Sequence, residues 1–227
     1  MSTDITIEYG EEIFNIEIDD DFNMIFLDYN IVHDMAALEF GYPDTPALKL
    51  LQRWKSYPID IVIDNVGLSK NQLVLIAADW AEHVFPIFHE RFKYDQWVHE
   101  AIVAAREHAN SASSVQSAEN AWYNAMKAVN NVGGSIILEG ALCAARAARD
   151  AVHSAFSGRD WKNLIRNVSY DALHGAAFEA TNQEAITDFP GSVAYEAEKN
   201  WQIRHALKVL EYTRGERANW PSVEVSP

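Results

Sequence analysis

The stretch ALCAARAARDAVHSAF, residues 141–156, is the densest run of alanine in this 227-residue chain. Seven of the fifteen residues from 141 to 155 are alanine, the strongest helix former. Because small side chains let helix axes approach closely, the stretch predicts a central helix of a packed array. The single cysteine, Cys143, lies within it and is predicted to be a buried structural thiol.

Helical patterns continue on both sides of this stretch. Ser69 opens one pattern, and Pro86 falls inside it, where proline should bend or split the helix. Ser113 and Gln116 form a capping box that should start another helix. About six helices joined by short turns are expected over residues 67–216, which is typical of an antiparallel helical array.

The first third of the chain has a different pattern. ITIEYG at residues 5–10 and IFNIEI at 13–18 alternate apolar and polar residues, which predicts a β-hairpin. MIFLDY at 24–29 and IDIVID at 59–64 predict a third and a fourth strand. Short helices are expected over residues 31–40 and 47–54.

These patterns divide the chain into three parts. Residues 1–66 form a small β-containing module, 67–216 form the helical domain, and 217–227 form a loose tail in which Trp220 is exposed. The predicted fold class is therefore mainly α, an antiparallel helical bundle with a small N-terminal α+β module.

Charge is distributed unevenly between these parts. The formal net charge is −15, and residues 1–66, with 14 Asp or Glu and three Lys or Arg, carry −11 of it. A surface of this sign repels the phosphate backbone of nucleic acid, so direct nucleic-acid binding is not expected. It suits a basic or nucleic-acid-binding protein partner. No signal peptide and no apolar run of membrane-spanning length are seen, so we expect a cytoplasmic protein without membrane contact.

The acidic residues of the module are candidates for a partner-binding surface. They fall on the hairpin and its following loop, where Phe22 could supply an apolar anchor. The carboxylates are those of Glu11, Glu12, Glu17, Asp19, Asp20, Asp21 and Asp28.

Two Asp-x-x-His pairs offer a different function. Asp150 precedes His153 by three residues, and Asp171 precedes His174 by the same spacing, so each pair shares a helix face. Similar pairs hold metals in helical bundles, and a metal-dependent enzyme is the alternative function. The other interpretation is two local Asp–His contacts, with no metal and no cofactor. We find no Gly-x-Ser-x-Gly nucleophile motif and no phosphate-binding loop, so no catalytic residues are assigned.

Residues 68–178 resemble a bacterial family of alanine-rich helical immunity proteins that accompany polymorphic toxins. The run beginning at Leu68 resembles the opening of that family, with its tryptophan, acidic centre and proline. The matching residues are Trp80, Glu82, Val84, Phe85 and Pro86. AIVAAREHA, ENAWYNAM and AARAA, at residues 101–109, 119–126 and 144–148, match later helices.

The resemblance implies a protein that neutralises another protein by binding it. We therefore expect a non-enzymatic inhibitor of a toxin or of a nucleic-acid-handling defence enzyme, including a phage anti-defence role. On the helical part the candidate contact residues are Trp80, Glu82 and His83. A scaffold subunit is a further alternative, and the oligomeric state is left open.

Overall fold

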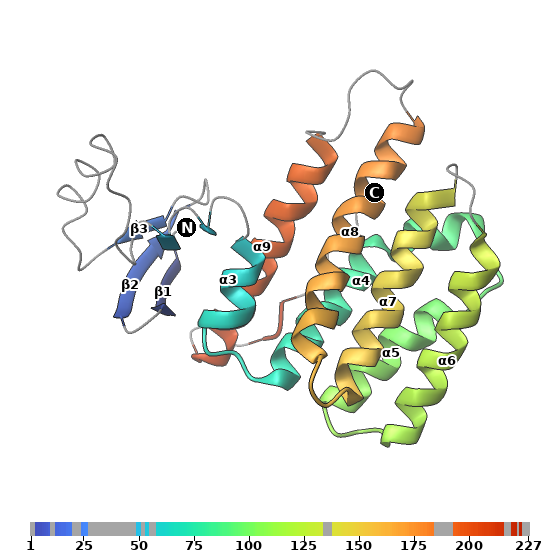
Figure 1. Ribbon diagram of the computed structural model, residues 1–227, viewed down its shortest axis with the longest axis horizontal. Helices are drawn as coiled ribbons and strands as arrows, with labels where there is room; N and C mark the ends of the chain where they lie inside the picture. The colour runs from blue at the N-terminus through green and yellow to red at the C-terminus, as the bar shows by residue number, and fades with distance from the viewer. Residues whose placement is uncertain are drawn as a thin grey trace. The chain divides into compact units, whose positions relative to one another are not determined.

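The computed structural model describes residues 3–9, 12–19, 24–26, 49–50, 53–54, 58–133, 138–183, 193–215, 219–221 and 223 (Figure 1). The chain divides into two compact units, Met1–Leu68 and Ser69–Pro227. The division lies close to the change of composition at Val66 and Gly67.

The predicted hairpin is confirmed. β1 (Thr3–Tyr9) pairs antiparallel with β2 (Glu12–Ile18), and β2 pairs with the short β3 (Met24–Phe26). The alternating pattern separates two faces, as expected for a half-buried strand pair. The buried face carries Ile5, Ile7, Phe14, Ile16 and Ile18.

The fourth predicted strand is wrong, because residues 58–65 form helix α3 (Pro58–Asn65). Pro58 suits the first position of a helix, and Asp60 in the first turn complements the helix dipole. Ile59, Ile61, Val62 and Ile63 are all buried in this helix. The alternation of β-branched residues, which predicted a strand, did not determine the structure of this segment. Residues 49–50 and 53–54 are helical, as predicted, whereas the helix predicted over 31–40 lies outside the described residues.

The second unit consists of helices, which confirms the mainly α fold class. Six are described in residues 69–227: α4 (Lys70–Arg91), α5 (Trp97–Ala109), α6 (Val115–Val132), α7 (Glu139–Phe156), α8 (Trp161–Gln183) and α9 (Val193–Thr213).

Helix α7 is the centre of this unit. It packs against α4, α5, α6 and α8, and in Figure 1 it lies between α6 and α8. All seven of its alanines are buried, and Cys143 is buried with them, as predicted. Burial raises the pKa of the Cys143 thiol to about 12, so the thiolate is scarce at neutral pH. Gly175 of α8 lies within van der Waals distance of α7, so small residues set the close helix approach.

Two helix details differ from the sequence prediction. Helix α4 runs unbroken through Pro86, so the proline does not split it. Helix α6 is capped by Ser114 rather than Ser113, because the Ser114 side chain accepts a hydrogen bond from the backbone N–H of Ser117. Ser69 opens α4 with a capping box completed by Gln72.

The segment after α9 is not a loose tail where the structure describes it. Trp220 donates a hydrogen bond to Asp79 at 2.8 Å and packs edge-on against Tyr212. Pro221 is buried. The predicted exposure of Trp220 is wrong, because its indole N–H has a buried carboxylate as partner.

Candidate functional site

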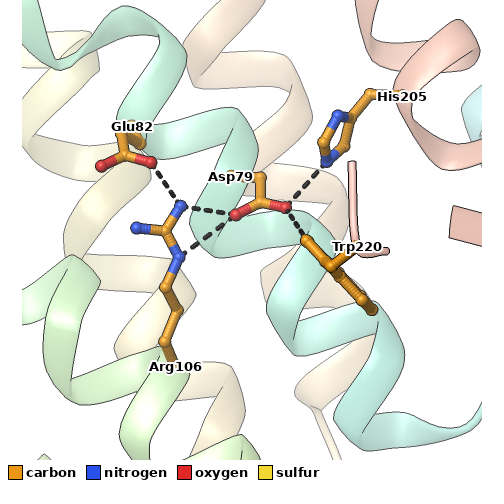
Figure 2. A network of polar contacts seen from close by, with 5 residues as sticks. All are labelled: Asp79, Glu82, Arg106, His205 and Trp220. Carbon is orange, nitrogen blue, oxygen red and sulfur yellow. Dashed lines mark hydrogen bonds and ion pairs between the residues drawn. The ribbon is translucent and has the colours of Figure 1, made fainter. Parts of the chain in front are cut away.

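A buried carboxylate, Asp79 of α4, joins three other segments of the helical unit (Figure 2). One oxygen accepts a hydrogen bond from Nε of Arg106 on α5 at 3.1 Å and another from its Nη2. The other oxygen accepts from Nε2 of His205 on α9 at 2.7 Å and from Trp220. Arg106 also donates to Glu82. The charge of Asp79 is therefore compensated by several donors, as burial requires.

A second set of buried polar contacts joins α4, α8 and α9. His83 Nδ1 lies 2.7 Å from Oε2 of Glu198, whose other oxygen accepts from Gln202 at 3.0 Å. Gln202 in turn accepts from the hydroxyl of Ser169 at 2.6 Å. The imidazole of His83 stacks on Trp201 at a centroid distance of 3.6 Å. These contacts fix the orientation of α9 against α4 and α8.

These networks change the interpretation of the candidates on α4. The Trp80 side chain is completely buried, and His83 is only 5% exposed and bound to Glu198. Their burial in this conformation counts against a direct contact with a partner, and their assignment as contact residues stays a prediction. Glu82 is partly exposed, but it is bound to Arg106.

The two residues of the first Asp-x-x-His pair contact different neighbours. Asp150 is buried and accepts a hydrogen bond from Nε of Arg149 at 2.6 Å. His153 packs between the rings of Trp122 and Phe156, and burial lowers its pKa. Each residue of the pair therefore has contacts of its own, Asp150 with Arg149 and His153 with aromatic rings.

In the second pair the histidine contacts aromatic rings. His174 contacts Tyr170 and Tyr195, and burial lowers its pKa. Burial, reinforced by the negative charge of Asp150, raises the pKa of Asp171 to about 7. Among the residues that the structure describes, no group of three or more His, Cys, Asp or Glu side chains is arranged to hold a metal ion.

The polar face of the hairpin, which we call the acidic sheet face, comprises Asp4, Thr6, Ile13, Asn15 and Glu17. Asp4 lies directly opposite Glu17 across the two strands, and Thr6 donates a hydrogen bond to Asn15. Ile13 is 66% exposed on this face. The face therefore combines paired carboxylates with an uncovered apolar side chain.

Several acidic candidates cannot be placed on this face. Asp19 is half-buried at the end of β2. Glu12 lies in β2, but its side chain is outside the described residues, as are Glu11, Asp20, Asp21, Phe22 and Asp28.

Two hollows in the helical unit have no counterpart in the sequence analysis. The larger, about 770 Å³, lies at the α4–α5 turn and includes Tyr94 and Trp97. The other, about 390 Å³, lies between α4, α8 and α9 and includes His83 and Glu198. Its walls come from residues about 100 positions apart in the chain, so no local sequence pattern signals it.

Comparison with protein-family models, with curated proteins and with solved structures gives no match. In the described part of the chain, none of the helices has the length and apolar character needed to cross a membrane.

Proposed function

We propose that this protein is a non-enzymatic inhibitor that binds and neutralises a basic protein, and that the acidic sheet face is its contact surface. The candidate targets are those expected from the sequence, a toxin or a nucleic-acid-handling defence enzyme. Such an enzyme needs a basic cleft for its phosphate substrate, and a carboxylate-rich surface is complementary to that cleft.

The observation that carries this proposal is the pairing of Asp4 with Glu17. Like charges directly opposite each other on one sheet face repel each other. A lysine or arginine of a partner placed between them would turn this repulsion into attraction. The arrangement thus offers a partner's cation two carboxylates at once.

The exposed Ile13 supports the same surface. Charge at an interface mainly accelerates association and sets specificity, whereas affinity needs apolar groups that lose water on binding. Ile13 follows the turn of the hairpin on the side of Asp4 and Glu17 and remains 66% exposed. It can supply the apolar contact that the carboxylates lack.

The competing contact surface, formed by Trp80, Glu82 and His83 of the helical unit, has weaker support. Trp80 and His83 are buried, and Asp79 and Glu198 are bound within the unit by donors from other helices. These contacts stabilise the helical packing, which leaves the acidic sheet face as the better candidate.

Affinity capture with matched baits tests the proposal. The wild-type protein is compared with an Asp4→Asn, Glu17→Gln variant and with a Glu107→Gln, Glu119→Gln control. The control changes the net charge equally, at exposed positions of α5 and α6. We expect a basic protein that the wild type and the control capture equally and that the sheet variant loses by about tenfold, about 1.4 kcal/mol.

Equal capture of that protein by all three baits contradicts the proposal. The sheet variant should also unfold within about 1 kcal/mol of the wild type, since the substitutions keep side-chain size and relieve a repulsion. This measurement distinguishes loss of binding from loss of folding.

A further inference from the structure

The pocket between α4, α8 and α9 has the volume of a small-ligand site, about 390 Å³. It exists because alanines occupy the facing positions of α8 and α9, where longer side chains would fill the space. Ala176 and Ala180 come from α8, and Ala194 and Ala197 from α9.

The charged side chains among the described lining residues are acidic, apart from any charge on His83. Three carboxylates, those of Glu90, Glu179 and Glu198, reach it, and neither lysine nor arginine is among its described lining residues. Its other walls are apolar, with Pro86 and Trp201 facing the alanines. A ligand that matches this lining has a cationic end and an apolar body.

The three carboxylates differ in their contacts and exposure. Glu179 pairs with Arg91, and the buried Glu198 is bound to His83. Glu90 is exposed and makes no hydrogen bond or ion pair with the rest of the described chain.

We propose that this pocket binds an organic cation, an ammonium or guanidinium group carried on a short alkyl stem. The head group would lie near Glu90 and Glu179, and the stem along the alanine walls. Free diamines carry this chemistry, and so do lysine and arginine side chains of a protein. The site goes beyond the proposed inhibitor function and does not depend on the acidic sheet face.

Calorimetric titration of the full chain with agmatine tests the site, because agmatine has a guanidinium and an ammonium joined by four methylenes. n-Butylurea is the neutral counterpart with a similar stem. We expect saturable agmatine binding at one site and at least tenfold weaker binding of n-butylurea, since the latter is neutral and forms no ion pair with carboxylates.

Two variants locate the binding. Ala180→Leu fills the pocket from a half-buried position and should abolish agmatine binding, while circular dichroism shows an intact helical fold. Glu90→Gln should weaken binding about threefold, as for an exposed ion pair. Glu119→Gln, at an exposed position of α6 outside this pocket, should bind as the wild type does.

Titration with putrescine and with blocked arginine amide separates the two sources of the cation. Binding of putrescine and agmatine without blocked arginine indicates a free diamine, and binding of blocked arginine as tight as agmatine indicates a protein side chain. The proposal is overturned if no probe shows measurable binding at concentrations up to about 10 mM. It is also overturned if n-butylurea equals agmatine or if Ala180→Leu binds unchanged.

Discussion

Asp79 accepts hydrogen bonds from α5, from α9 and from the segment that follows α9. Replacing it with alanine leaves the buried His205 and the indole of Trp220 without their acceptor, and it removes one of the two carboxylates that hold Arg106. Asp79→Ala should therefore lower the free energy of unfolding by about 3–5 kcal/mol. Urea denaturation followed by circular dichroism measures this change.

Glu82→Gln is the matched control, because Glu82 binds the same Arg106 guanidinium as Asp79. Glu82 is partly exposed, and Arg106 keeps Asp79 as its partner, so this substitution should cost less than about 1 kcal/mol. Equal costs for the two variants would mean that burial of Asp79 has no special role in holding the helices together.

The pKa of Asp171 predicts a pH dependence of stability. Its folded-state pKa of about 7 exceeds the ordinary value of 3.8, so the folded state favours the protonated carboxyl. Stability from this residue is fully present below about pH 4 and falls as the pH rises to about 7. Asp171→Asn removes this loss. The variant should be more stable than the wild type at pH 8, and the difference should shrink towards pH 4.

Urea denaturation of the wild type and of Asp171→Asn at pH 4, 6 and 8 measures this dependence. A stability difference that stays constant over the three pH values would show that the carboxyl does not titrate in this range.

Contacts of single residues were the part that the sequence could predict least. The sequence places Asp79 and His83 one helical turn apart, which suggests a pair. In the structure each binds a different residue of α9, His205 and Glu198, more than 100 positions away. Such partners follow from helix packing, which a single sequence does not specify.

At the scale of elements, the two glycines at the contact between α7 and α8 differ in the room they leave for a methyl group. A methyl group added at Gly175 would meet Cβ of Cys143 at 3.5 Å, an ordinary contact, and one added at Gly140 would meet the Gly175 carbonyl oxygen at 3.3 Å. Alanine also disfavours the unfolded chain relative to glycine. Gly175→Ala should therefore stabilise the protein by about 0.5–1 kcal/mol.

Gly140→Ala is the comparison within the same helix pair. Its tighter contacts with the Gly175 carbonyl and with Ile87 should offset the gain, so this variant should be less stable than Gly175→Ala. Thermal unfolding of both ranks them, and destabilisation by Gly175→Ala would show that the α7–α8 contact has no room for a methyl group at this position.

Helices and strands were predicted well where the apolar residues follow one clear period along the sequence. The hairpin follows from strict alternation over residues 14–18, and α7 from the alanines of 141–156. The prediction failed at residues 59–64, where Ile and Val fit both periods and β-branching favoured the wrong one.

For the molecule as a whole, the charge difference between its two parts could be predicted from composition. Residues 1–66 carry −11 of the total −15, and the structure separates a unit at nearly the same boundary. Composition could not predict which carboxylates face each other, because the strand register determines the pairing of Asp4 with Glu17. The pocket between α4, α8 and α9 also depends on packing and had no sequence signal.

The central claim is that the acidic sheet face binds a basic partner. The most direct measurement is the association rate constant between this protein and the captured partner as a function of ionic strength. The account predicts that the rate falls steeply between about 0.05 and 0.5 M salt, because the Debye length shortens through that range. It also predicts that Asp4→Asn, Glu17→Gln lowers the rate by about tenfold at low salt and flattens this dependence. A wild-type rate for that variant, with the same salt dependence, would contradict the account.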